Sequence, residues 1–422
     1  MRLTWQSAGT LCISLNQSRL ARLYRCTFFS GESLILPRHR LTLLLSALTL
    51  QACGSMASDD EASASFAAYR QQTLEWMQQQ RSFQTTDHPT ELQWNAPQEW
   101  RPQGPLKGGI LLVHGLGDSP WSFHDIGEKL AAQGFLVRTV LLPGHGTKPS
   151  DMLDVTLGQW QDVVRQQANI LSRDVPKVYL GGFSTGANLV LDYAYDHDEI
   201  AGLVLFSPAF RSDSKYAWMT QWIGWARPWL ANPNDGGRPL QTPVRYLNVP
   251  TNGFAQFYRS SVLAQKRLGQ RSYDKPVFIA ITQHDSVLDT GYVLDNFNQR
   301  FSNPASRLIW YGDDPAVSAK TPRVLVRTDY LPDYRISRFS HMGLMFSPAN
   351  PLYGENGQQR ICWNGQSTAD MQLCLNGDQV WYSDWGYREV GKVHARLTFN
   401  PYFEWQSGVM LQVLEAAGTL AK

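Results

Sequence analysis

The sequence lacks any block of like charge and has little net charge. Its 38 Lys and Arg residues nearly balance its 36 Asp and Glu residues, which leaves a formal net charge of +2 at pH 7. A nucleic-acid-binding domain usually has a strong basic excess or a basic stripe. We therefore expect no nucleic-acid partner, and charge alone indicates no other class of ligand.

Cysteine is scarce, with five residues in a chain of 422. Neither cysteine nor histidine recurs at the short spacings that zinc ligands require. We therefore expect no metal site and no other cofactor.

Long apolar runs are absent as well, and the run from Leu41 to Leu50 is too short to span a bilayer. The basic stretch 38–40 precedes this run, and Ala52 and Cys53 end it. A basic start, a short apolar centre and a small-residue end are the parts of a secretory signal peptide. We therefore predict that residues 1–52 are a signal region.

The end of this signal, Leu50–Cys53, resembles the lipobox of bacterial lipoproteins. The resemblance implies that Cys53 is diacylated and becomes the first residue of the mature protein. Gly54 stands where an aspartate favours inner-membrane retention in such proteins, which favours the outer membrane. The expected location is the bacterial cell envelope, with the protein lipid-anchored and facing the periplasm. An ordinary cleaved signal with an incidental cysteine is the alternative.

Residues 1–36 lie upstream of this signal, where no signal peptide is expected to be preceded by more chain. We therefore expect the true start codon to lie nearer Leu34 or Leu36. After the signal, residues 53–90 are predicted to form a polar tether that leads into one helix. Four apolar residues recur there at helical spacing: Phe66, Tyr69, Leu74 and Met77.

Export would permit a disulfide bond. Cys12 and Cys26 lie in the signal region and Cys53 is assigned to lipid, so Cys362 and Cys374 remain as a pair. We predict a disulfide between them. Closing a loop of this length stabilises a fold by roughly 3 kcal/mol in the chain-entropy estimate.

From Gly108 onward, apolar runs alternate with amphipathic helices. Four runs are expected to be strands buried on both faces: Ile110–Val113, Phe135–Leu142, Val178–Leu180 and Leu203–Phe206. Three helices are expected between them, one after Ser119, one after Thr156 and one over Ala187–Tyr195. This alternation predicts the α/β class with a doubly wound, mostly parallel sheet. We assign residues 91–422 to this domain.

Ser184 is the candidate nucleophile. It is the serine of a G-x-S-x-G motif, Gly182–Gly186, between the third strand and the third helix. A sharp turn from strand to helix exposes the serine hydroxyl at the sheet edge, and the flanking glycines allow the close packing of that turn. The motif alone recurs by chance, so its position between a strand and a helix is what gives it weight.

Asp285 is the candidate acid of a catalytic triad. It follows the strand predicted at Val277–Thr282, and open parallel sheets place functional groups at this end of their strands. Asp289 is the alternative, one helical turn farther on. Capping of a helix is a further possible role for Asp285, and it is compatible with catalysis.

His341 is the candidate base, and His394 is the alternative. His341 lies in a loop-like segment after the strand predicted at Leu308–Tyr311, and the nucleophile, acid and histidine follow in that order in this class of motif. The spacing from the acid is long, and we expect an insertion at Asp313–Pro332 with its own strand at Val324–Arg327.

The chemistry needs each of these groups. His341 would take the proton of Ser184, and Asp285 would fix the imidazole tautomer and stabilise its charged form. The tetrahedral oxyanion then needs hydrogen-bond donors. The backbone N–H groups of Leu116, after a His-Gly pair, and of Thr185, at a helix N-terminus, are the expected oxyanion hole.

Aromatic residues are abundant, with 15 Trp, 17 Tyr and 18 Phe, and many lie in an expected insert at about residues 210–275. Four tryptophans there recur at helical spacing and predict one aromatic stripe: Trp218, Trp222, Trp225 and Trp229. We expect this insert to be a cap whose inner face contacts apolar substrate. A helix packed onto the domain is the alternative.

Several motifs together resemble those of the α/β-hydrolase family. These are HGLGDS, LLPGHGTKP followed by a tryptophan, GFSTG, HDSV and SHMG. The likeness is closest to the carboxylesterase, monoacylglycerol lipase and lysophospholipase branch. It implies an eight-stranded sheet, a cap after the sixth strand and ester cleavage through an acyl-enzyme. It also implies that His145 belongs to a structural loop near the site. The segment 350–392, which contains the cysteine pair, has no counterpart and is expected to be a C-terminal insert.

The leading hypothesis is therefore a membrane-tethered serine hydrolase that cleaves carboxylic esters. Its substrate would be a lysophospholipid, a monoacylglycerol or a short acyl ester. A serine peptidase of the same fold is one alternative, and it would need an acidic group near the site to hold a substrate amine. A lipoprotein that uses the fold only for binding is another.

Overall fold

The computed structural model describes residues 65–233, 239–314, 317 and 322–419. The signal region, the lipidation residue Cys53 and most of the tether lie outside the described residues. The helix predicted before residue 90 is present as α2 (Phe66–Gln80), and α3 (His88–Asn95) follows it.

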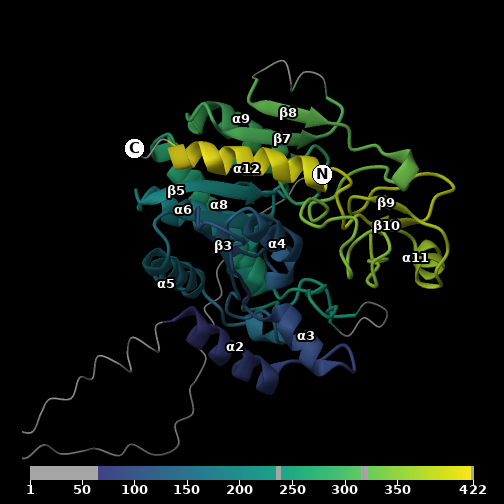
Figure 1. The fold of residues 1–422 in the computed structure, drawn as a ribbon. Coiled ribbons are helices and arrows are strands. Elements are labelled where there is room, and N and C mark those ends of the chain that lie inside the picture. Colours follow the sequence, from purple (N-terminus) through teal and green to yellow (C-terminus); the bar gives the residue numbers. More distant parts are fainter. Residues whose placement is uncertain (1–64, 234–238, 315–316, 318–321, 420–422) are drawn as a thin grey trace, which may run out of the picture. The chain divides into compact units, whose positions relative to one another are not determined.

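The core of the domain is an eight-stranded sheet (Figure 1) in the order β1-β3-β2-β4-β5-β6-β7-β8. Its strands are β1 (Glu99–Trp100), β2 (Gly108–Val113), β3 (Phe135–Val140), β4 (Val178–Phe183), β5 (Ile200–Phe206), β6 (Val277–Thr282), β7 (Arg307–Tyr311) and β8 (Val324–Arg327). β1 pairs antiparallel to β3, and all other neighbours are parallel. The predicted mostly parallel α/β sheet is confirmed.

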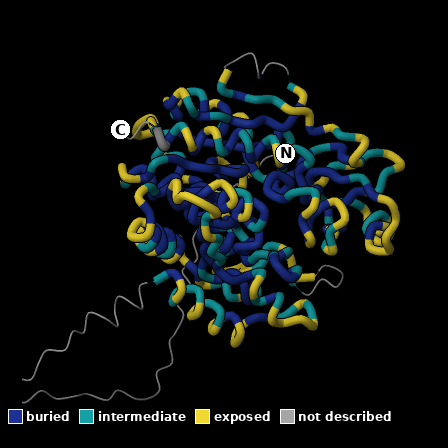
Figure 2. The backbone as a smooth tube through the Cα atoms, viewed as in Figure 1, coloured by how far each residue is buried: buried dark blue, intermediate teal, exposed yellow. Residues whose placement is uncertain are grey.

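The inner strands are mainly apolar because both faces of the sheet are covered. Every residue of β2, β3, β4 and β6 is buried (Figure 2). Alternate residues of β2 divide between two cores: Ile110 and Leu112 pack on the side of α4 (His124–Ala132) and α12 (Phe403–Thr419). Leu111 and Val113 pack on the other side.

The other face is covered by the helices that connect the strands. These are α5 (Leu157–Asp174), α6 (Thr185–Tyr195), α8 (Thr251–Gln270) and α9 (Thr290–Arg300). The predicted start of α5 at Thr156 is confirmed: the hydroxyl of Thr156 accepts from the Gln159 N–H, and the Gln159 side chain accepts from the Thr156 N–H. Such a reciprocal cap satisfies two backbone donors that a helix start leaves open.

The strand predicted at Val324–Arg327 exists, but it does not belong to an insertion. It is β8, which pairs in parallel with β7 at the edge of the main sheet. The long spacing between Asp285 and His341 therefore has a simple origin. The chain completes two more strands of the sheet, β7 and β8, before it reaches the histidine.

The insert expected at about residues 210–275 lies between β5 and β6, which is after the fifth strand of this sheet when its strands are counted along the chain. The last part of the expected insert is α8, which packs against α6 over the sheet. The earlier part of the insert, described over residues 211–233 and 239–250, contains two short helices, η3 (Ala217–Met219) and α7 (Thr220–Ile223).

The prediction that four tryptophans form one stripe on a single helix is wrong. α7 ends at Ile223, before Gly224, so the helix does not reach Trp225 or Trp229. Glycine and the Pro228 that follows favour the end of a helix over its continuation. Trp218, Trp222 and Trp225 are 50%, 65% and 88% exposed, so these rings face outward instead of forming a buried inner face.

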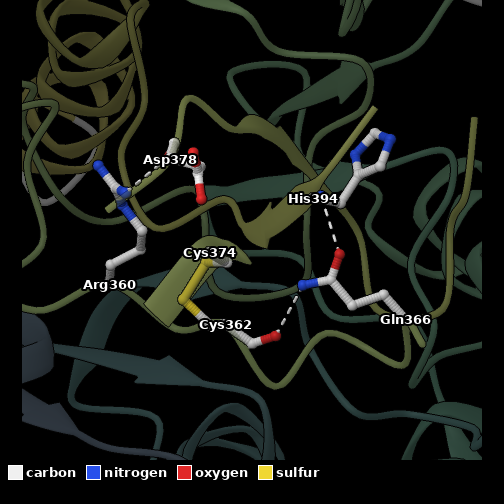
Figure 3. The surroundings of a disulfide bond; sticks show 6 residues. All are labelled: Arg360, Cys362, Gln366, Cys374, Asp378 and His394. Atoms are coloured by element: carbon white, nitrogen blue, oxygen red, sulfur yellow. Dashed lines mark hydrogen bonds between the residues drawn. A yellow bond between two sulfur atoms is a disulfide. The ribbon is translucent and has the colours of Figure 1, made fainter. Parts of the chain in front are cut away.

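The C-terminal insert forms a small structure of its own beside the sheet (Figure 1). It contains α11 (Thr368–Leu375) and the short strand β9 (Trp381–Ser383), which pairs in parallel with β10 (His394–Arg396) just after the insert. The predicted disulfide joins Cys362 to Cys374 of α11 (Figure 3). After β10 the chain returns to the sheet as α12.

Candidate active site

Ser184 lies in the sharp turn between β4 and α6. Its φ of 54° and ψ of −114° are unusual for a residue with a side chain, and such strain persists only where the surroundings enforce it. A Cβ atom at Gly186 would lie 2.0 Å from the Val113 carbonyl oxygen, and one at Gly182 would lie 2.4 Å from the Ala187 nitrogen. Both glycines of the motif are therefore required by backbone packing.

His341 and Asp285 are hydrogen-bonded to each other. His341 Nδ1 lies 2.7 Å from Asp285 Oδ2, and both side chains are buried. The other carboxylate oxygen of Asp285 accepts from the N–H groups of Val287 (2.8 Å) and Leu288 (3.1 Å). An ionised carboxylate can only accept, so Nδ1 carries the proton and Nε2 is left as the basic nitrogen.

The two alternative residues lie elsewhere. Asp289 caps α9 by accepting from the Tyr292 N–H, and its carboxylate also pairs with Arg211. His394 is in β10, just after the C-terminal insert, and its ring packs edge-on against Tyr387 of the insert. Its backbone N–H donates to Gln366, whose side chain donates in turn to the Cys362 carbonyl (Figure 3).

The segment that presents the base, here called the histidine loop (Leu331–Phe346), is held from several directions. The Ser207 hydroxyl donates to the His341 carbonyl (2.9 Å), and the Ser340 hydroxyl donates to the Leu397 carbonyl (2.6 Å). The rings of His341 and Phe183 lie 5.0 Å apart, centre to centre. Because Phe183 directly precedes Ser184, this contact places the histidine ring beside the nucleophile turn.

The segment that would supply the oxyanion donors packs against Ser184. A Cβ atom at Gly115 would lie 3.2 Å from the Cβ of Ser184. Leu116 follows directly, and the next residue, Gly117, is fixed on both sides: its N–H donates to His145 Nε2 (3.0 Å) and its carbonyl accepts from the Tyr246 N–H (2.7 Å). Thr185 is the first residue of α6, where backbone N–H groups are free of intrahelical partners.

Two buried histidines support this segment. His114 Nε2 accepts from the Leu142 N–H (3.0 Å), and its Nδ1 donates to the Gly115 carbonyl (2.8 Å). Burial lowers the pKa of His114 to about 4. Burial, with a smaller effect of His114, lowers the pKa of His145 to about 3. Both rings are therefore neutral at pH 7 and act as hydrogen-bond supports.

Sequence reasoning missed two residues of the site. Ser207, which fixes the His341 carbonyl, has a φ of 40°, and only its place at the end of a buried strand marks it in the sequence. Asp384 of the C-terminal insert approaches the Asp285 segment, and its pKa is raised chiefly by burial. No sequence signal links residue 384 to residue 285, because the contact depends on how the insert folds.

No cluster of three or more His, Cys, Asp or Glu side chains suited to a metal ion occurs among the described residues. Within the same part of the chain, no helix is both long enough and apolar enough to cross a membrane.

This chain is similar to a known protein family and to several named proteins. A family model described as serine aminopeptidase, S33, matches residues 104–311. The thermostable monoacylglycerol lipase of Bacillus sp. (strain H-257) is 29% identical over 188 residues, which is 44% of this chain and 74% of that protein. A monoacylglycerol lipase of Mycolicibacterium smegmatis is 26% identical over 26% of this chain and 41% of its own length.

Solved structures are similar at lower identity. One, from work on the metagenome-derived lipolytic enzymes LipS and LipT, is 20% identical and covers 53% of this chain and 89% of its own, with a TM-score of 0.45. The monoacylglycerol lipase of Paleococcus ferrophilus is 19% identical and covers 51% of this chain and 87% of its own, with a TM-score of 0.41.

Proposed function

Because the chain belongs to the α/β-hydrolase family, in its esterase and lipase branch, we propose that it cleaves carboxylic esters through Ser184, His341 and Asp285. The observation that supports this most is the 2.7 Å hydrogen bond between Asp285 and His341, with the His341 ring packed beside the turn of Ser184. A serine hydroxyl needs such an oriented base to act as a nucleophile at neutral pH.

In the proposed reaction, Ser184 Oγ attacks the ester carbonyl carbon while its proton passes to His341 Nε2. Asp285 holds the Nδ1 proton and stabilises the imidazolium. The ester C–O bond then breaks, and the departing alcohol takes the proton from His341. Water, activated by the same nitrogen, hydrolyses the acyl-enzyme and restores Ser184.

The oxyanion formed in both steps would be held by the N–H groups of Leu116 and Thr185. Gly117, fixed by His145 and Tyr246, holds the Leu116 side of this hole in place. Removal of one donor of this kind costs about 3 kcal/mol in the barrier.

A monoacylglycerol or another single-chain lipid ester is the substrate class that we favour. Two relatives are named monoacylglycerol lipases. The cap exposes several large apolar side chains within a short segment, namely Tyr216, Trp218, Met219, Trp222 and Trp225. Aromatic surfaces of this kind suit contact with a lipid aggregate, since tryptophan and tyrosine favour the boundary between apolar and aqueous phases.

The proposed site of action is the bacterial cell envelope. Diacylation of Cys53, predicted from the lipobox-like Leu50–Cys53, would hold the domain on the outer membrane and facing the periplasm. A substrate dispersed in the same membrane would then lie within reach of the tether.

The test is reaction of the purified protein with a fluorophosphonate beside Ser184→Ala, followed by hydrolysis of p-nitrophenyl esters of increasing chain length and of monoacylglycerol. We expect labelling and turnover in the parent and neither in the variant. An unlabelled parent, or equal turnover in both proteins, would remove the proposal. Release of amines from peptide substrates without ester turnover would instead favour the peptidase alternative.

A further inference from the structure

Two segments that are far apart in the sequence hold Gly117 from opposite sides. The first, here called the His145 segment (residues 141–147), follows β3, and its His145 Nε2 accepts from the Gly117 N–H. The second, here called the Tyr246 segment (residues 242–246), belongs to the insert between β5 and β6, and its Tyr246 N–H donates to the Gly117 carbonyl. Gly117 therefore keeps its place only while both segments keep theirs.

The two segments are also bound to each other. The Thr147 N–H donates to the Tyr246 hydroxyl (3.0 Å), and the rings of His145 and Tyr246 are stacked with their centres 6.1 Å apart. Leu116, whose N–H is a proposed oxyanion donor, directly precedes the Gly117 that they hold. The position of this donor therefore depends on how the two segments lie relative to each other.

Arg81, which caps the end of α2, bridges these two segments with one buried guanidinium group. Its Nη1 donates to the Gly146 carbonyl of the His145 segment (2.5 Å), and its Nη2 donates to the Pro243 carbonyl of the Tyr246 segment. The side chain of Arg81 is only 1% exposed. The donors of a guanidinium group are held in one rigid plane, so the group fixes the relative position of the two carbonyls that it binds.

Glu91 of α3 orients this guanidinium group. Its Oε1 accepts from Arg81 Nε (2.9 Å), and Arg81 Nη2 lies 2.7 Å from the same oxygen. Its Oε2 accepts from the N–H (2.7 Å) and the hydroxyl (2.9 Å) of Thr85. Desolvation offsets much of the attraction within a buried ion pair, so we assign this pair to the orientation of Arg81 and not to net stability.

The same helix pair, α2 and α3, contacts both segments a second time. The Ser82 N–H, next to Arg81, donates to the Thr147 carbonyl of the His145 segment (3.1 Å). Asn95 Nδ2, at the end of α3, donates to the Pro243 carbonyl of the Tyr246 segment (2.7 Å). The bridge is therefore part of a docked element and does not depend on one side chain for its position.

We infer that Arg81 is a positioning residue of the oxyanion hole, which sets the Leu116 donor by joining the His145 segment to the Tyr246 segment. The inference rests on the proposed function and extends the hydrolase site to the helix pair α2 and α3. Arg81 does not touch the reacting atoms; it acts through Gly117. Oxyanion donors must be aimed at the charge that develops in the transition state, so loss of the bridge should lower turnover and not substrate binding.

The experiment uses three variants of the full chain: Arg81→Lys, Glu91→Gln, and a double variant with Arg81→Met and Glu91→Gln. Lysine keeps a positive charge beside Glu91 but lacks the planar fork. The double variant removes both charges, so it leaves no buried charge unpaired. Glu91→Gln alone removes the ion pair and keeps the Arg81 bridge. Arg70→Lys is the matched control, because Arg70 is also in α2 and binds the Pro97 carbonyl and the Gln93 side chain.

For each protein we measure kcat and KM with p-nitrophenyl butyrate, the inhibition constant of a trifluoromethyl ketone, and the Tm. Active sites are counted by fluorophosphonate labelling carried to completion, so that unfolded protein does not enter kcat. The ketone forms a reversible hemiketal with the catalytic serine, and the oxygen of this adduct lies where the oxyanion of the reaction would lie. Its inhibition constant therefore reports on the oxyanion hole separately from substrate binding.

We expect kcat per active site to fall by about tenfold to a hundredfold in Arg81→Lys and in the double variant, with KM unchanged. The inhibition constant of the ketone should rise by a similar factor in both. Glu91→Gln should lower the Tm but keep the parent kcat per active site, because the bridge is still present. The Arg70→Lys control should match the parent in kcat, KM and inhibition constant.

A lower Tm or fewer active sites in the Arg81 variants, with a parent-like kcat per active site and inhibition constant, would overturn the inference, since that pattern describes a purely structural residue. So would an equal fall of kcat in Glu91→Gln, which keeps the bridge. If one of the two Arg81 variants does not fold, the other decides the outcome. A parent that fluorophosphonate does not label would reject the proposed function itself, which is a distinct result.

Discussion

At the scale of single residues, the turn around Ser184 leaves no space for side chains on its two glycines. The strained turn at Ser184 was predictable because this crowding imposes a short local pattern, with a glycine two residues before and two residues after the serine. The position of Asp285 was predictable because it lies shortly after the end of the buried strand β6. Ser207 and Asp384 were not, because their contacts join segments far apart in the chain: Ser207 and His341 are 134 residues apart.

The crowding predicts a strong effect of Gly186→Ala. The new methyl group would meet the Val113 carbonyl at 2.0 Å, which is backbone and cannot move aside. We expect a loss of about 3 kcal/mol in the free energy of unfolding, measured by urea titration. Gly408→Ala in α12 is the control, since nothing lies within 4 Å of that position. This variant should gain about 1 kcal/mol.

The buried histidines predict how stability depends on pH. His114 and His145 have pKa values of about 4 and about 3 in the fold, below the 6.5 of a free histidine. The unfolded chain therefore binds more protons below pH 6.5, and stability should fall as the pH drops from 6.5 towards 4. Each pKa unit corresponds to about 1.4 kcal/mol.

Urea titrations at several pH values measure this slope. His145→Gln keeps an acceptor for the Gly117 N–H and has no proton to gain, so its slope should be shallower than that of the parent. His88→Gln, at an exposed position, is the control and should keep the parent slope. Equal slopes in all three proteins would contradict the assignment of the acid sensitivity to the buried pair.

At the scale of elements, the strands that are apolar on both faces were predicted well and the cap was not. The strands β2, β4, β5 and β6 consist almost entirely of apolar residues and glycine because each is covered on both sides, so their burial can be read from the sequence alone. The tryptophan spacing in the cap fits a helix, yet Gly224 and Pro228 end it early. The role of β8 was missed because pairing at a sheet edge leaves no distinct sequence pattern.

The C-terminal insert offers a prediction at this scale. Replacing both Cys362 and Cys374 by serine removes the bond that ties α11 to the start of the insert. We expect the free energy of unfolding to fall by roughly 3 kcal/mol. Thermal melts with and without a reducing agent check this, because reduction should lower the Tm of the parent towards that of the variant and leave the variant unchanged.

At the scale of the whole molecule, the fold and the family were predictable from motif order and strand alternation. The cellular location remains a prediction. If Cys53 carries lipid, Cys53→Ala should move the protein from the membrane fraction to the soluble periplasmic fraction of a bacterial host. Fractionation followed by immunoblotting measures this, with Ser184→Ala as a control that should stay membrane-bound. Retention of Cys53→Ala on the membrane would reject the anchor.

The placement of the histidine loop between the sheet and the insert has a consequence for the order in which activity arises during synthesis. Ser184, Asp285 and His341 all leave the ribosome before the segments that hold the loop in place, β9 and the residues around Leu397. A nascent chain that already contains all three residues therefore lacks the contacts that fix its base. We therefore expect hydrolysis by the proposed site to begin only when β9 and the residues around Leu397 have folded against the histidine loop.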